Sequence, residues 1–327
     1  MVQGRRVSRS SLVAGALLLC ALGAALATPQ LLGTRVGSAL ETLERADPRW
    51  LWLAATGFTL AVVGSAGSWR SAMGLCGGRT TLTDATARYG SGSLVNTFIP
   101  ARAGDALRLA LFSRLVPGEH PVQATSGAFV ALGAARAVVL GTLVLIGAFA
   151  GALPLWPLLA AAGLVAIAIA LVVRARHSRA HLLDAFRALA ADPVAATRII
   201  GWIALSIVGR VAAATAVGAA LGIDQPFIAA LAIIPALDVA GIVPLTPGNV
   251  GVASAAMAFA YRANGASFNT GLAAGITFQA VETAVGISIG LAGLLWLAPH
   301  PRPLRRIVLA SAVLGSAIGA AVLVPLL

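Results

Sequence analysis

The sequence has no lysine and little charge of either sign. Charged residues make up 10% of the 327 residues, against about 25% in an average soluble domain, and 59% of the residues are hydrophobic. Mean hydropathy is +0.92. A water-soluble protein of this length needs a more polar surface, so the composition excludes a cytosolic enzyme and indicates a polytopic membrane protein. Two cysteines, Cys20 and Cys76, are too few and too far apart for a disulfide framework.

The chain also lacks the sequence motifs of catalysis and cofactor binding. It contains no GxSxG, no HExxH and no phosphate-binding P-loop. His177 and His181 have a metal-compatible spacing, but no third ligand stands beside them. We therefore expect that the protein is not an enzyme and that it holds no cofactor or metal.

The 23 basic residues are all arginines, and the net charge is +12. They are scattered at the ends of apolar stretches rather than gathered on one polar face. This distribution favours membrane phospholipids over nucleic acid as partners. The use of arginine in place of lysine, with abundant alanine, glycine, leucine and valine, is typical of GC-rich coding, so we expect a protein of a bacterial inner membrane.

Apolar runs predict about seven membrane spans. They cover residues 10–34, 50–69, 121–150, 158–173, 199–221, 270–297 and 307–327. The first run is either an uncleaved helix with a cytoplasmic N-terminus or a signal peptide that ends near Ala27. The arginine-rich loop 174–198 is the strongest cytoplasmic marker, and counting spans from it places the C-terminus outside.

Two further segments, 80–120 and 226–263, do not have the pattern of plain spans. The orientation of the basic loop requires the first to start and end in the cytoplasm and the second to start and end outside. The interrupting residues are Pro100, Gly104 and Pro117 in the first and Pro235, Asp238, Pro244, Pro247 and Gly248 in the second. We predict an all-α membrane helix bundle, a single domain over 1–327, with two re-entrant or broken segments in inverted halves of about 80–150 and 226–297. The alternative is a pair of ordinary proline-kinked helices.

The first broken segment carries a charged cluster. Asp105 and Arg108 are three residues apart, so they share a face of a helix that restarts at Gly104. Arg102 and Arg108 can present guanidinium groups to a phosphate in a bidentate way. The alternative is that both arginines reach lipid headgroups at the interface while Asp105 caps the helix.

The second broken segment has two prolines and two glycines within residues 244–251, which forbid a continuous helix. Backbone amides that follow Pro247 and Gly248 can bind an anion, and Asn249 can bond a lipid headgroup. The alternative is a tight turn without a ligand.

Four isolated charges lie within predicted apolar segments. They are Arg136, Arg210, Asp238 and Glu282. Placing a single unpaired charge in the bilayer interior costs several kcal/mol or more of free energy. We therefore expect the two arginines and the two acids to pair inside the bundle. The pairing scheme stays open, as does the choice between a transport role and a structural one.

At these two motifs the chain resembles the transmembrane domain family of lysylphosphatidylglycerol synthases. The residues that fill the family pattern of the first motif are Pro100, Arg102, Gly104, Asp105 and Arg108, and those of the second are Pro244, Pro247, Gly248 and Gly251. Asn249 and Ser254 depart from it, since the family usually has glycine and glutamate there. The resemblance spans roughly residues 10–327, and we expect no soluble aminoacyl-transferase domain within them.

The resemblance implies translocation of an anionic phospholipid, or of a lipid-linked intermediate, between leaflets. In this hypothesis Arg102, Arg108 and Arg210 line a polar groove that carries the headgroup. The acids Asp105, Asp238 and Glu282 pair with the arginines between cycles or carry a proton. The alternatives are a secondary transporter of a small anionic solute and a non-transporting scaffold that binds a partner membrane enzyme; a homo-oligomer also fits.

Overall fold

The structure is a computed structural model that describes residues 46–99, 103–151, 191–240 and 250–298, with a few isolated positions between 163 and 188. The elements of these residues are all α-helical. They are α2 (Pro48–Leu75), α3 (Leu82–Phe98), α4 (Ala103–Ser113), α5 (Pro121–Phe149), α8 (Pro193–Ala220), α9 (Pro226–Ala240), α10 (Val250–Ala263) and α11 (Phe268–Leu297).

Four of these helices, α2, α5, α8 and α11, are long and apolar enough to cross a membrane. The predicted all-α membrane protein is confirmed at this level. Three of the predicted spans, 10–34, 158–173 and 307–327, lie outside the described residues, so the full number of spans stays a prediction.

Two of the long helices, α2 and α8, begin at side chains that cap their first turns. Asp47 accepts a hydrogen bond from Arg49 N, and Asp192 accepts one from Ala195 N; each is followed by a proline at the first helical position. Because Asp192 starts α8, the helix begins earlier than the predicted 199–221. Assigning Arg198 to the basic loop was therefore wrong, since it lies within α8.

Each predicted broken segment contains two described helices. The first contains α3 and α4, and the second contains α9 and α10. Pro235 does not interrupt the second segment as expected, because it lies inside α9. Residues 100–102 and 241–249, which join the paired helices, lie outside the described residues, so the expected meeting of the two tips stays a prediction.

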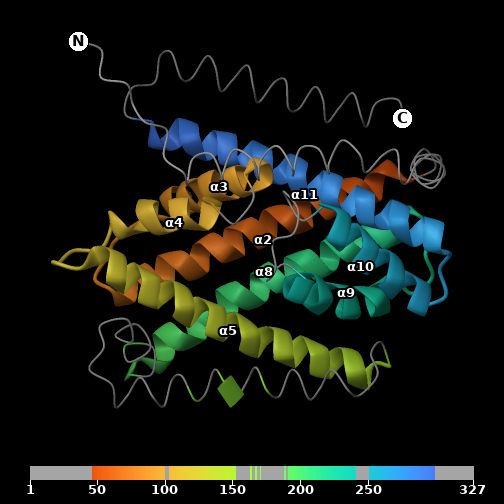
Figure 1. Ribbon diagram of the computed structural model, residues 1–327, viewed down its shortest axis with the longest axis horizontal. Helices are drawn as coiled ribbons and strands as arrows, with labels where there is room; N and C mark the ends of the chain where they lie inside the picture. Colours follow the sequence, from red (N-terminus) through yellow and green to blue (C-terminus); the bar gives the residue numbers. More distant parts are fainter. Residues whose placement is uncertain are drawn as a thin grey trace, which may run out of the picture.

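The centre of the bundle is the packing of α2 against α8 (Figure 1), the most extensive helix contact of the described residues. The two backbones touch: a Cβ on Gly57 would lie 2.6 Å from the carbonyl oxygen of Gly209, and one on Gly209 would lie 2.5 Å from that of Gly57. Small residues permit such close approach in membrane proteins. Figure 1 also shows α5 and α11 on opposite sides of this pair, with α3 and α4 near one end of the bundle and α9 and α10 near the other.

A second close seam joins α3 to α11. A Cβ on Gly290 would lie 2.6 Å from Leu94 Cβ and 2.8 Å from the carbonyl oxygen of Gly90. On its other side α11 packs against α10, where Gly275 lies against the backbone of Ser254. Glycines on α11 therefore fix its position between the two broken segments.

We expect Gly209→Ala to destabilise the protein, because the two atoms nearest to the added methyl group, Gly57 O and Ala61 N, belong to the backbone of α2 and cannot move aside as a flexible side chain can. Overpacking of this kind typically costs about 1–3 kcal/mol. Gly201→Ala is the matched control: it lies on the same helix, and a Cβ there meets nothing within 4 Å. The measurement is the midpoint of thermal unfolding in detergent. Equal midpoints for the two variants would contradict the close α2–α8 contact.

Candidate functional site

Arg136, Arg210, Asp238 and Glu282 come together in the interior of the bundle, each from a different helix. Both Nε and Nη2 of Arg136 lie 2.8 Å from Asp238 Oδ2. Arg210 Nη1 donates to the other carboxylate oxygen, Oδ1. The expected pairing of two arginines with two acids is therefore present, and Asp238 is its centre. We name these four residues the interior charge cluster.

Glu282 is held more loosely than Asp238. Its Oε1 lies 3.8 Å from Arg210 Nη2, beyond hydrogen-bond distance, and its side chain is 39% exposed. The Asp238 side chain is 12% exposed and has arginine donors on both oxygens. The two acids of the cluster therefore differ: one is locked in place, and the other can move without breaking a hydrogen bond to Arg210.

Arg210 has an unused donor. Its Nε is buried and has no hydrogen-bond partner among the described residues. Buried N–H groups in proteins are almost always paired, and an unpaired one costs about 1–3 kcal/mol. The Nε and Nη2 atoms form one edge of the planar guanidinium, and this edge has the geometry that binds carboxylates and phosphates in a bidentate way.

A second polar group lies within the first broken segment, where α4 folds back on α3. Asn96 Oδ1 accepts from Gly104 N at 2.7 Å, and Asn96 Nδ2 donates to Asp105 Oδ1 at 3.2 Å. Arg108 Nη1 donates to the same Asp105 oxygen at 2.6 Å, which confirms the predicted pair on one helix face. Asn96 thus fixes the start of α4 and orients its first carboxylate.

Arg108 is also bound to α3 through its remaining nitrogens. Nη2 donates to Ser93 Oγ at 2.6 Å, Nε donates to the carbonyl oxygen of Tyr89 at 3.3 Å, and Cζ lies 4.0 Å from the centre of the Tyr89 ring. The side chain is 12% exposed. This places the Arg108 side chain between α3 and α4 rather than at an exposed position among lipid headgroups.

Tyr89 connects the two polar groups. One face of its ring stacks on Arg108 of α4, and its hydroxyl lies within electrostatic range of Arg210 of α8. Sequence reasoning missed Tyr89, Ser93 and Asn96. Their spacing of four and then three residues places them on one face of a helix, so a polar stripe in an apolar segment was the signal that could have found them.

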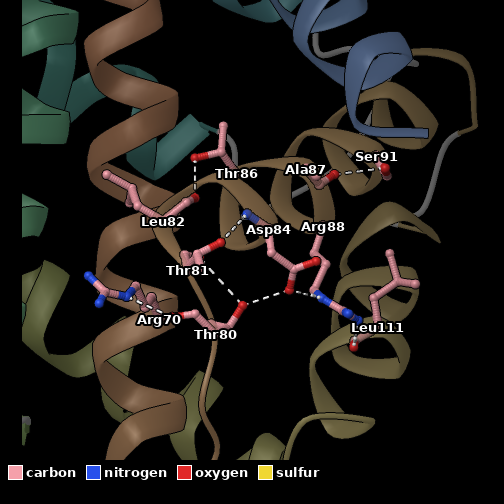
Figure 2. Close-up of polar contacts among 10 residues, drawn as sticks. All are labelled: Arg70, Thr80, Thr81, Leu82, Asp84, Thr86, Ala87, Arg88, Ser91 and Leu111. Atoms are coloured by element: carbon pink, nitrogen blue, oxygen red, sulfur yellow. Dashed lines mark hydrogen bonds and ion pairs between the residues drawn. The ribbon is translucent and has the colours of Figure 1, made fainter. Parts of the chain in front are cut away.

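A third network lies at the start of α3 (Figure 2) and joins it to α2 and α4. Arg70 Nε donates to the carbonyl oxygen of Thr80 at 2.9 Å, and Thr80 Oγ1 donates to Asp84 Oδ2 at 2.6 Å. Arg88 donates from Nε to Asp84 Oδ2 at 2.9 Å and from Nη1 to the carbonyl oxygen of Leu111 at 2.6 Å. This network fixes the base of the first broken segment.

The Asp84 carboxylate is stabilised by its neighbours. Burial alone would raise its pKa, but the hydrogen bonds from Arg88 and Thr80 and the charge of Arg88 outweigh burial and hold the pKa of Asp84 below its ordinary value of 3.8. Because the pKa is lower in the folded protein than in the unfolded one, the stabilisation is fully present above about pH 4 and is lost as the pH falls through the folded value.

We expect Asp84→Asn to lower the unfolding midpoint at neutral pH, because the amide loses the charge that pairs with Arg88. The difference from the native protein should be constant between pH 7 and pH 5 and should shrink below about pH 4, where the native carboxylate becomes protonated. Thermal unfolding over this pH range measures it. A difference that does not change with pH would exclude the ion pair as its origin.

The remaining predicted site residues are not brought into these groups. Arg102, Pro247, Gly248 and Asn249 lie outside the described residues, so their roles stay predictions. Ser254, at the position where the family usually has glutamate, is 5% exposed and its backbone packs on Gly275. Within the described ranges, no three His, Cys, Asp or Glu side chains gather as a metal site requires.

Comparison with known proteins identifies one family. The family model described as "Lysylphosphatidylglycerol synthase TM region" matches residues 11–290, and no synthase domain is detected within the 327 residues. Among curated proteins no match is found. The matched range contains both broken segments and the whole interior charge cluster.

Proposed function

The chain belongs to the lysylphosphatidylglycerol synthase transmembrane family, and from this we propose that it translocates an anionic phospholipid, or a lipid-linked intermediate, between the leaflets of a bacterial inner membrane. The acyl tails stay in the bilayer while the headgroup crosses through the helix bundle. No chemical bond is made or broken in this function.

The interior charge cluster is the observation that carries this proposal. Two arginines and two acids in an apolar bundle are costly, and intramembrane charges generally mark a pathway for an ion or a polar substrate. Arginine is also the side chain best suited to a phosphate, because its planar fork binds two oxygens. The second polar group, around Asp105 and Arg108, contacts Tyr89, and we place it on the same polar path as the cluster.

The packing of the helices supports the inverted repeat. The helices form four pairs: α2 with α8, α3 with α9, α4 with α10 and α5 with α11. When the two members of every pair are exchanged, the α2–α8 contact maps onto itself, and each other extensive helix contact maps onto one that is also present. The close contacts of α2 with α8 are reciprocal in the same way, since Gly57 lies against Ala213 and Gly209 lies against Ala61. A two-fold axis in the membrane plane explains both observations and relates broken segments that enter from opposite ends.

The two halves differ in how closely α5 and α11 pack against the broken segments, and we place the entry of the headgroup at one of these looser contacts. Glycines bring α3 and α11 into backbone contact, whereas the equivalent helices α9 and α5 have a smaller contact and are joined through Arg136 and Asp238. The Arg136 side chain is 30% exposed. Side chains can exchange partners more easily than packed backbones can separate, so the α5–α9 seam opens to the lipid.

Purified protein in liposomes tests this function. A fluorescent phosphatidylglycerol probe should exchange between leaflets faster than in empty liposomes, and faster than a fluorescent phosphatidylcholine probe, as measured by quenching from outside with dithionite. Uptake of labelled inorganic phosphate by the same liposomes separates lipid translocation from transport of a small anion. Phosphate uptake without lipid exchange would overturn the proposal, as would the absence of both.

We propose the orientation that the basic loop predicts, and the arginines at the described helix ends support it. At one end of the bundle Arg70, Arg79, Arg114 and Arg198 are exposed, and this end should face the cytoplasm. At the opposite end Asp47 N bonds to the carbonyl oxygen of Ala220, and Gly218 lies against Pro226 and Tyr261.

Cysteine labelling of intact cells checks this orientation. In a background with Cys20 and Cys76 replaced by serine, Arg79→Cys should not react with a membrane-impermeant maleimide, because the loop between α2 and α3 is cytoplasmic. Arg262→Cys, an exposed arginine at the opposite end, is the matched control and should react. Labelling of Arg79→Cys alone would reverse the orientation.

A further inference from the structure

The interior charge cluster is electrically neutral when both acids are ionised, because its two arginines balance Asp238 and Glu282. A phosphodiester carries one negative charge. If such an anion joins the cluster, one negative charge is left uncompensated in an apolar interior, which is costly. Protonation of one carboxylate restores neutrality, so binding of the anion and binding of a proton favour each other.

The geometry distinguishes the two acids. Asp238 accepts from both arginines, with Arg136 Nε and Nη2 each at 2.8 Å, and removing its charge would weaken the hydrogen bonds of both guanidinium groups at once. Glu282 approaches the cluster only to 3.8 Å, and its side chain is 39% exposed. Glu282 is therefore the carboxylate that can take up a proton without loss of a hydrogen bond to an arginine.

The surroundings of Glu282 agree with this assignment. The charged groups that act on it are Arg210 of α8, Arg136 of α5 and Asp238 of α9. From α3, the Tyr89 hydroxyl acts on Arg210. The other helices packed on α11 contribute apolar or small groups: α2 places Phe58 on Phe278, and α10 packs its backbone at Ser254 and Ala258 against Gly275 and Gly271.

We propose that Glu282 is a proton-binding site that couples the protein to a pH gradient: one proton binds its carboxylate when one phosphodiester anion binds the Nε–Nη2 edge of Arg210. Arg210 Nε is buried and unpartnered among the described residues, and Nη2 faces only the distant Glu282 oxygen on this edge. When Glu282 is protonated its attraction to Arg210 ends, and the lipid phosphate takes its place. The inference rests on the proposed lipid translocation and adds its energy source.

Coupling of one proton to one monoanionic lipid is electroneutral and has a defined magnitude. At equilibrium, the ratio of lipid concentrations in the two leaflets should be about tenfold for each unit of pH difference across the membrane. The reason is that one pH unit is a factor of ten in proton activity. Lipid should accumulate on the alkaline side, since it travels with the proton.

The experiment uses the full chain in liposomes of phosphatidylcholine with a trace of fluorescent phosphatidylglycerol. Valinomycin and equal potassium on both sides remove the membrane potential, and a pH difference of one unit is imposed. For the native protein we expect a transleaflet ratio of the probe that approaches tenfold, and no ratio for a fluorescent phosphatidylcholine probe. For Glu282→Gln we expect the ratio to return to one. Glu119→Gln, which replaces an exposed acid in the loop before α5, is the matched control and should keep the native ratio.

The outcomes separate the two proposals. If the native protein exchanges no anionic lipid, the proposed function fails. If it exchanges lipid but the pH difference produces no ratio, the function stands and the coupling fails. A ratio that survives in Glu282→Gln assigns the proton to another group and overturns the role of Glu282. If Glu282→Gln does not fold, Glu282→Asp decides: the coupling requires its pH dependence to shift, and an unchanged pH dependence overturns it.

Discussion

Replacing Asp238 with asparagine should abolish lipid exchange and cost more stability than the other substitutions proposed for this protein. The carboxylate accepts from Arg136 and Arg210 on its two oxygens, and its side chain is 12% exposed. The amide keeps the shape but leaves the two arginines with one counter-charge, that of Glu282, whose Oε1 lies 3.8 Å from Arg210 Nη2 and makes no hydrogen bond to it. Removing one partner of a buried ion pair typically costs about 3–5 kcal/mol. The measurements are the unfolding midpoint in detergent and exchange of fluorescent phosphatidylglycerol in liposomes.

Two further variants show whether this loss comes from unpaired charge. Asp238→Asn combined with Arg136→Gln removes the excess positive charge that the single substitution leaves in the cluster, so part of the unfolding midpoint should return. Asp84→Asn breaks an ion pair whose carboxylate side chain is 23% exposed, against 12% for Asp238, and should cost less because water screens it more. An Asp238→Asn protein as stable as the native one would show that Asp238 is not the centre of the cluster.

The sequence predicted the parts of the fold that depend on local physical chemistry. Length and apolar composition gave the four long helices, and the interruption predicted near residue 100 agrees with the end of α3 at Phe98. The boundaries were less accurate, because the first turns of α8 contain Arg198 and were too polar to be recognised as part of a span. Pro235 was taken as a break, but tertiary packing around α9 tolerates it.

For the candidate site, the cost of burying a charge was the strongest sequence signal. It selected Arg136, Arg210, Asp238 and Glu282 before their positions were known. Which of them pair could not be predicted, since Arg136 and Asp238 are 102 residues apart and meet only through packing of α5 on α9. Uncharged members such as Tyr89 and Asn96 carry no such cost, so only the pattern of α3 pointed to them.

The unequal roles of the two acids also depend on the tertiary structure. In the sequence, Asp238 and Glu282 are equivalent isolated carboxylates. In the folded chain one has arginine donors on both oxygens and the other lies 3.8 Å from its nearest arginine nitrogen. In the coupling that we propose, this difference gives the cluster one fixed carboxylate and one that can be released, whereas two equal pairs would form a static structural core.

Arg210→Lys should reduce lipid exchange by about 10- to 100-fold while the protein still folds. Lysine retains the positive charge and can still reach Asp238, but it has no planar fork and loses the Nε–Nη2 edge. Hydrogen bonds to charged groups contribute about 1.5–3 kcal/mol, which corresponds to this range in rate. Initial rates of phosphatidylglycerol exchange, normalised to the amount of folded protein in the liposomes, measure the loss.

The control for this prediction is the same substitution on the same helix. Arg198→Lys changes an exposed arginine in the first turns of α8, where a positive charge at the interface is sufficient, so its exchange rate should equal that of the native protein. If Arg210 served only to neutralise Asp238, lysine would replace it and both variants would exchange lipid at the native rate. A loss confined to Arg210→Lys requires the bidentate edge of the guanidinium, and places the lipid phosphate at the centre of the bundle.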